Sequence, residues 1–207
     1  MKNILSIVHF PKDVGGRQFS GLSRVMFNIS NEMGDDKNIN YVTISTDKLF
    51  GGNYKFINYG IISPIVIFTL IKKAIHIKRF YKLIKEFYPE GLSFKQMIQY
   101  IVVNSFSSLK KWDIIHIHSI DHGFVCKCKD YNTKIIYTNH GVIADDKNIN
   151  NFLNIQNRER LVSRINLDFM VFVSEGARAK WSSFYGPFNC GSSVISNAID
   201  NNFWKVL

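Results

Sequence analysis

Short apolar runs rich in Ile and Val alternate along the chain with longer segments in which apolar residues recur every three or four positions. The short runs predict strands at 3–9, 41–45, 54–59, 113–118, 134–138, 169–173 and 193–196. The longer segments predict helices at 21–33, 64–88, 93–109, 149–165 and 175–185. This alternation is typical of β-α-β units. It predicts an α/β fold, a Rossmann-like parallel sheet with helices on both faces.

The chain has 207 residues, of which 46% are hydrophobic and 20% are charged, and this composition excludes a disordered protein. No internal repeat or linker divides it, so we expect a single domain over residues 1–207. The three cysteines, Cys126, Cys128 and Cys190, fit neither a disulfide framework nor a zinc knuckle, and we expect reduced thiols in the cytoplasm. The longest apolar run, 61–71, is too short to span a bilayer.

The 26 Lys and Arg residues against 16 Asp and Glu residues give a net charge of +10, which favours anionic partners. The segment 61–88 combines basic residues with interleaved aromatic ones. Two interpretations stay open: a helix that lies on an anionic membrane surface, and a covering helix with a solvated basic face. No nucleic-acid-binding motif accompanies the charge, so we expect no nucleic-acid partner.

Ligands of parallel sheets bind beyond the carboxyl ends of the strands, and the residues at those positions are rich in Gly, His, Ser and Asn. Gly15 and Gly16 follow the first strand, and Gly21 precedes a helix. Glycines in this place let backbone N–H groups approach a phosphate. The alternative is a β-to-α turn that uses glycine only for its conformation.

Two histidines lie on the same face of the strand 113–118, because side chains in a strand alternate between its faces. His118 is predicted nearest the cleft, where it would bond the hydroxyl of a sugar or alcohol. The alternative is that both are hydrogen-bonded core residues, which is favoured for His116 because it lies deeper. His140 follows the next strand and is predicted to face the same crevice, or else to bond its own turn.

Ser174 and Asn197 follow the last two strands and are candidate ligand contacts. Ser174 also has a structural interpretation, since Ser is a preferred N-cap and Glu175 suits the first helical turn.

A metal site is a third interpretation of the first histidine pair. His116, His118, Asp121 and His122 come within one residue of the H-x-H-x-D-H cluster of metal-dependent hydrolases. The extra residue changes the ligand directions, so we expect no metal and keep the hydrolase as an alternative.

In their order and spacing, these motifs resemble the N-terminal half of GT-B glycosyltransferases, in particular the retaining family 4, over nearly the whole chain. The matching segments are 4–9 with Gly15 and Gly16, 113–118, 137–141, 172–175 and 194–200.

The resemblance implies that this domain binds mainly the acceptor, while a second domain binds a nucleotide-sugar donor as co-substrate, without a metal or other cofactor. It implies His118 as a catalytic residue, Gly15 and Gly16 at the donor diphosphate, and His140, Ser174 and Asn197 as substrate-binding residues. The implied partner is a glycan or lipid-linked acceptor, as in bacterial lipopolysaccharide synthesis, at the inner face of the membrane.

The chain departs from the family at Ala198, where glycine is usual, and at Leu207, where the family's donor-binding domain would begin. We therefore expect the chain to be inactive alone and to need a donor-binding domain, which a separate chain would supply. A non-catalytic glycan-binding, nucleotide-binding or scaffold module is the other alternative.

Overall fold

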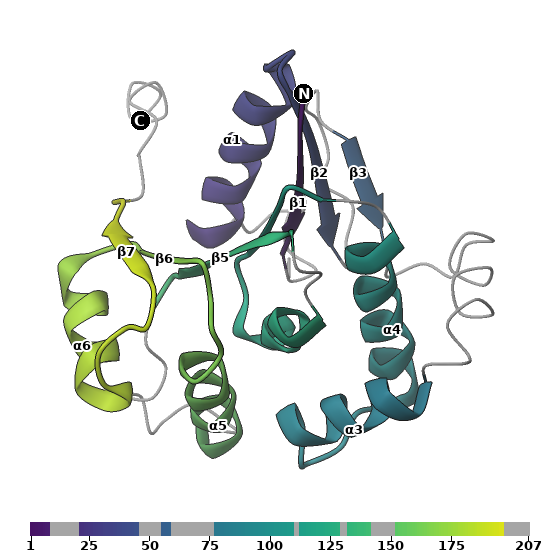
Figure 1. The fold of residues 1–207 in the computed structure, drawn as a ribbon, viewed down its shortest axis with the longest axis vertical. Coiled ribbons are helices and arrows are strands. Elements are labelled where there is room, and N and C mark those ends of the chain that lie inside the picture. The colour runs from purple at the N-terminus through teal and green to yellow at the C-terminus, as the bar shows by residue number, and fades with distance from the viewer. Residues whose placement is uncertain are drawn as a thin grey trace, which may run out of the picture.

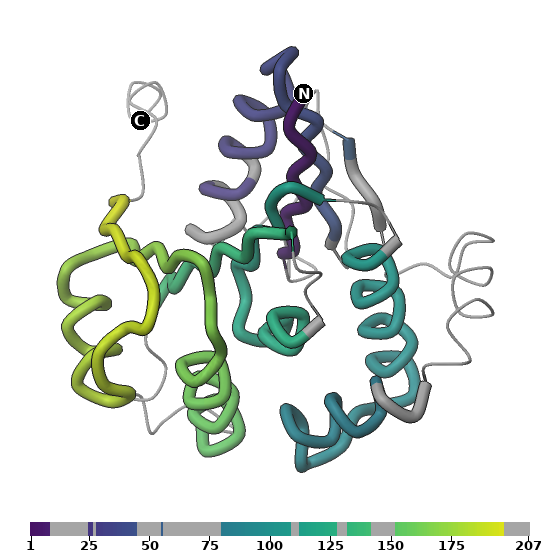
Figure 2. Tube along the Cα trace, in the orientation of Figure 1, coloured from purple at the N-terminus to yellow at the C-terminus, as the bar shows by residue number. Residues whose placement is uncertain are grey.

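The structure is a computed structural model that describes residues 1–8, 21–45, 55–58, 77–109, 112–128, 132–141 and 152–196. Within these residues the chain forms a seven-stranded sheet in the order β3-β2-β1-β4-β5-β6-β7, and every neighbouring pair is parallel. The strands are β1 (Lys2–Ile7), β2 (Ile39–Ser45), β3 (Lys55–Asn58), β4 (Ile114–Ile117), β5 (Lys134–Asn139), β6 (Phe169–Phe172) and β7 (Gly191–Val194). In Figure 2 the purple β1 lies inside the sheet rather than at its edge.

Helices connect the strands and cover both faces of the sheet, as the alternation in the sequence predicts. They are α1 (Gly21–Asp35), α3 (Ile77–Phe87), α4 (Phe94–Leu109), α5 (Phe152–Ser163) and α6 (Glu175–Tyr185), with the 3-10 helix η2 (Ile120–Cys128) between β4 and β5. Figure 1 shows α1 and α4 on opposite sides of the strands β1 to β3. No helix in the described ranges is long and apolar enough to cross a bilayer.

The larger core lies on the sheet face that carries Leu5, Ile115 and Ile135. Alternate residues of each strand point to this face, where they meet the buried side chains of the covering helices. Phe87 of α3 and Trp181 of α6 are among the largest side chains removed from water. The burial of this much apolar surface is the main term that favours folding.

Helix α1 covers the opposite face of the sheet, which is more polar. Met26 of α1 is buried there, and the hydroxyl groups of Ser30 and Thr43 lie 2.9 Å apart in a buried hydrogen bond between α1 and β2. Because Thr43 pairs with Ser6 and Ser6 pairs with His116, a row of polar residues crosses this face from β2 to β4.

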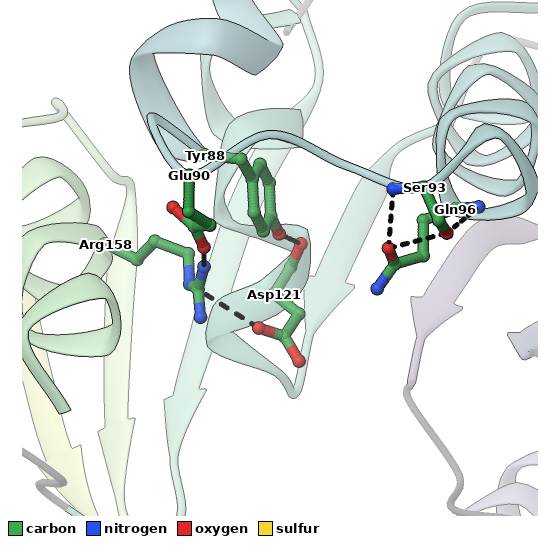
Figure 3. A network of polar contacts seen from close by, with 6 residues as sticks. All are labelled: Tyr88, Glu90, Ser93, Gln96, Asp121 and Arg158. Carbon is green, nitrogen blue, oxygen red and sulfur yellow. Dashed lines mark hydrogen bonds and ion pairs between the residues drawn. The ribbon is translucent and has the colours of Figure 1, made fainter. Parts of the chain in front are cut away.

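Local sequence explains where several elements begin. Ser93 and Gln96 form a capping box before α4: the Gln96 N–H donates to Ser93 Oγ at 3.3 Å, and the Ser93 N–H donates to Gln96 Oε1 at 3.0 Å (Figure 3). The predicted helix over 175–185 matches α6, and the predicted last strand overlaps β7 but begins two residues later. The 3-10 helix η2 was not predicted, because its nine residues show no helical periodicity.

Candidate functional site

Three imidazoles gather at the carboxyl ends of β4 and β5. The rings of His116 and His118 lie 3.8 Å apart, and the rings of His118 and His140 lie 5.6 Å apart, measured between centroids. The parallel pairing of β4 with β5 causes this arrangement, because it brings the ends of both strands to one edge of the sheet. The structure thus brings together the two histidines predicted to share a crevice.

His116 is held within the sheet. Its Nε2 lies 2.7 Å from Oγ1 of Thr138 on the neighbouring strand, and burial followed by the charge of His140 lowers its pKa to about 3. The prediction of a hydrogen-bonded histidine at this position is therefore confirmed.

His118 is more deeply buried than the sequence predicts. Its backbone N–H donates to the carbonyl of Ile7 at 3.0 Å, which extends the pairing of β4 with β1, and only 3% of the residue is exposed. The prediction that His118 is the more open of the pair is wrong, since His116 is half-buried while the ring of His118 lies between two other imidazoles. Burial, and then the charges of His116 and His140, hold the pKa of His118 well below its usual 6.5.

His140 faces His118 from the end of β5. The Nδ1 of His118 lies 3.4 Å from the Nε2 of His140, a long hydrogen bond in which either ring can be the donor. Burial lowers the pKa of His140 to about 4. The turn here is fixed by Asn139, whose Oδ1 accepts from the Gly141 N–H at 3.1 Å, so Asn139 rather than His140 bonds the turn.

This contact determines what the other two ring nitrogens offer. His118 Nε2 and His140 Nδ1 are buried, and neither has a hydrogen-bond partner among the described residues. A neutral imidazole carries one proton, so if His118 donates to His140, His118 Nε2 is an acceptor and His140 Nδ1 is a donor. If His140 donates instead, the two roles exchange. In both cases the pair presents one donor and one acceptor. Because the nearly linear contact places the two free nitrogens on opposite sides of the pair, each can bond a different hydroxyl group.

Ser174 acts as the N-cap of α6. The Ala177 N–H donates to Ser174 Oγ at 3.1 Å, and Ser174 has an extended backbone. The structural interpretation of Ser174 thus accounts for its hydroxyl oxygen. Three other predicted site residues, Gly15, Gly16 and Asn197, lie outside the described residues.

A network around Arg158 holds η2, the segment that follows His118. Figure 3 shows the Arg158 side chain reaching from α5 toward Glu90 and Asp121. Arg158 lies 2.8 Å from Oε1 of Glu90 and 3.6 Å from Oδ1 of Asp121, and its guanidinium stacks 4.7 Å from the ring centre of Tyr88. The Tyr88 hydroxyl donates to the backbone carbonyl of Asp121. Sequence reasoning missed this network because it joins residues from three separate segments.

The four residues of the hydrolase alternative are held in different contacts. Asp121 is paired with Arg158, and His122 packs against the rings of Tyr100 and Phe124. In the described part of the chain, no three residues among His, Cys, Asp and Glu are placed to hold a metal ion. The geometry therefore gives no support to a metal centre formed by His116, His118, Asp121 and His122.

Comparison with known proteins shows similarity in fold and not in sequence. No protein-family model and no curated protein sequence matches this chain. Sucrose-phosphate synthase from Thermosynechococcus elongatus superposes on 95% of the chain with a TM-score of 0.61 and 12% sequence identity. A second structure of this enzyme from the same organism covers 99% of the chain with a TM-score of 0.52 and 10% identity.

The match covers 48% of the first sucrose-phosphate synthase chain and 93% of the second, so this chain spans about half the length of the first. Sucrose-phosphate synthase is a GT-B glycosyltransferase. The predicted fold class is confirmed: the chain is a Rossmann-like α/β domain with the fold of one half of a GT-B protein.

Proposed function

We propose that this chain is the acceptor-binding half of a retaining glycosyltransferase of the family 4 type. In this proposal the enzyme transfers a sugar from a nucleotide-sugar to a glycan or lipid-linked acceptor. The observation that carries the proposal is the pairing of His118 with His140 at the carboxyl edge of a sheet with the GT-B fold.

The chemistry of the two histidines suits an acceptor hydroxyl. Their unpartnered ring nitrogens supply one donor and one acceptor on opposite sides of the pair, and separate hydroxyl groups of a saccharide can bond to them. Because both pKa values lie well below 7, the rings are neutral at physiological pH. A neutral imidazole with so low a pKa is a weak base, so the role of each histidine is to bind and orient a hydroxyl group rather than to remove its proton.

The remaining parts of the proposal follow the resemblance in sequence. Gly15 and Gly16 approach the donor diphosphate, Ser174 and Asn197 contact the substrate, and a donor-binding domain or a separate chain completes the cleft. The nucleotide-sugar enters as co-substrate, with no metal or other cofactor. Exposed basic residues of α3 dock the protein on an anionic membrane, beside a lipid-linked acceptor.

Saccharide binding tests the central step. The chain is titrated with mono- and oligosaccharides while the imidazole resonances of His118 and His140 are followed by NMR. We expect these signals to shift, and we expect His118→Gln and His140→Gln to weaken binding at least about tenfold. Lys180→Ala, an exposed change on α6, is the control. Unchanged binding in both histidine variants would contradict the proposal, and so would the absence of any response at millimolar saccharide.

A binding module without chemistry is the second candidate, and the low basicity of the buried His118 favours it. The two candidates differ in a complete two-domain protein. There, His118→Ala lowers turnover far more than saccharide affinity if the site is catalytic, whereas a binding module has no turnover to lose. The isolated chain incubated with nucleotide-sugars should transfer no sugar, and efficient transfer would show that a second domain is not needed.

A further inference from the structure

A polar cavity lies at the amino ends of the strands, away from the histidines. It has a volume of about 310 Å³, and it is lined by Arg160 and Ser163 of α5 and by Arg164, which directly follows the helix. The other wall comes from Phe184 and Tyr185 of α6 and from Pro187 and Asn189 in the segment that leads to β7. Because α5 and α6 each end shortly before the next parallel strand begins, this cavity lies at the amino ends of the strands, whereas His118 and His140 lie at the carboxyl ends.

Two guanidinium groups dominate the charge of this cavity. Arg160 and Arg164 are four residues apart in and just after α5, so they lie on the same side, one turn from each other. Neither forms an ion pair with any carboxylate in the described ranges. Glu159 is buried and accepts a 2.6 Å hydrogen bond from the Tyr185 hydroxyl, so its carboxylate is engaged inside the protein.

The neutral groups of the cavity are already oriented. The Ser163 hydroxyl donates to the Arg160 carbonyl at 2.8 Å, and the Tyr185 hydroxyl donates to Glu159. Both hydroxyl oxygens therefore remain as acceptors, while the arginines can only donate. The ring of Phe184, whose residue is 43% exposed, adds an apolar wall.

From these features we infer that the cavity binds a small phosphate monoester of a hydroxylated molecule, of the size of a sugar phosphate. Two neighbouring guanidinium groups match the geometry and charge of a phosphate. The hydroxyl acceptors and the Phe184 wall lie beside them and suit a sugar ring with hydroxyl donors. The volume of the cavity lies at the lower end of the range for ligand sites. The cavity is therefore larger than phosphate alone requires. This inference does not depend on the proposed glycosyl transfer.

Titration of the 207-residue chain with ribose 5-phosphate, followed by ¹H–¹⁵N NMR, tests the inference. We expect saturable shifts in residues 160–164 and 184–189 with a dissociation constant of about 1 mM or below. Ribose, which lacks the phosphate, should cause no such shifts, and inorganic phosphate should bind more weakly than ribose 5-phosphate. Raising the salt concentration should weaken binding.

Single substitutions locate the site. Arg160→Ala and Arg164→Ala should each weaken ribose 5-phosphate binding at least about tenfold, because each removes a charge-assisted contact. Lys180→Ala removes the same charge from α6 outside the cavity and should leave binding unchanged. The ¹H–¹⁵N spectrum of each variant reports whether its fold is intact.

Three results would overturn the inference. They are no saturable shift at 10 mM ligand (about ten times the expected constant), equal binding of ribose 5-phosphate and inorganic phosphate, and full affinity in both arginine variants. Loss of saccharide binding at His118 would leave this site untouched, so the two proposals fail separately.

Discussion

Nδ1 of His118 and Nε2 of His140 lie 3.4 Å apart at the ends of two adjacent parallel strands, in surroundings that keep both rings neutral at physiological pH. The contact joins residues that are 22 positions apart in the chain. It has a measurable consequence for the pH dependence of stability.

Acid should destabilise the protein through His118. Burial holds the pKa of His118 well below 6.5 in the folded chain, whereas in the unfolded chain its pKa is near 6.5. Below about pH 6.5 the unfolded chain therefore binds a proton that the folded chain excludes. The free energy of unfolding should therefore fall as the pH drops from about 6.5, by up to about 1.4 kcal/mol per pH unit from this residue. Urea unfolding between about pH 7 and 5 should show a shallower dependence in His118→Gln than in the wild type. Equal slopes would show that His118 takes up its proton normally in the folded state.

Removal of Arg158 should destabilise the junction of α5, η2 and the α3–α4 turn. The side chain is only 8% exposed and contacts Glu90 and Asp121, so Arg158→Met leaves two carboxylates that repel each other without a cation. We expect the free energy of unfolding to fall by about 2–3 kcal/mol. This value is below the range for fully buried pairs, because both carboxylates are about one-third exposed. Arg160→Met, an exposed change on the same helix, should cost less than about 0.5 kcal/mol. Adding Glu90→Gln to Arg158→Met should restore part of the loss, and strict additivity would exclude the coupling.

Ser174 can be tested for its two roles separately. Ser174→Ala removes the oxygen that caps α6 and should cost about 1 kcal/mol in thermal or urea unfolding. Ser174→Asp keeps a capping oxygen and should retain the stability of the wild type. If Ser174 also contacts the saccharide, the Asp variant should bind it more weakly despite its intact fold. A stable Asp variant with full saccharide affinity would leave Ser174 with the capping role alone.

Two glycines should respond oppositely to alanine. A Cβ on Gly123 would lie 2.5 Å from Cγ2 of Val162, so Gly123→Ala forces η2 away from α5 and should cost about 1–3 kcal/mol. Gly176 in the first turn of α6 has room for a Cβ, with its nearest contact at 3.8 Å. Gly176→Ala should therefore be neutral or stabilise the protein by up to about 1 kcal/mol, because alanine favours a helix. Similar unfolding midpoints for the two variants would contradict the close packing of η2 on α5.

Helix α3 should bind anionic membranes if the proposed docking is correct. Phe80, Ile84 and Phe87 are buried, while Lys82 and Lys85 are exposed and Tyr81 is 57% exposed, so the helix shows a basic and aromatic outer face. We expect sedimentation with vesicles that contain phosphatidylserine, and at least about tenfold weaker binding after Lys82→Glu and Lys85→Glu.

A double charge reversal on α6 is the control for membrane binding. Arg178→Glu with Lys180→Glu changes the net charge equally and should leave vesicle binding close to that of the wild type. Equal losses for the two double variants would show attraction by net charge alone, without a docking face on α3. Vesicles of neutral lipid should not bind the protein.

The sequence by itself determined the fold class and the elements of the sheet. Alternating apolar patterns are local, and the seven predicted strands overlap β1 to β7 because each buried strand must carry its own apolar residues. The N-cap at Ser174 was also visible, since capping depends on residues within one turn. The histidines at the ends of β4 and β5 were placed on one edge because parallel strands end together.

Only the tertiary structure decided how these side chains are used. The depth of His118 depends on the His116 and His140 rings packed on either side of it, and strand periodicity alone placed it in the open cleft. The Arg158 network and the arginine cavity join segments far apart in the chain, and no local pattern encodes such contacts. Their energies come from burial and from the distance between charges, which are fixed when the helices pack on the sheet.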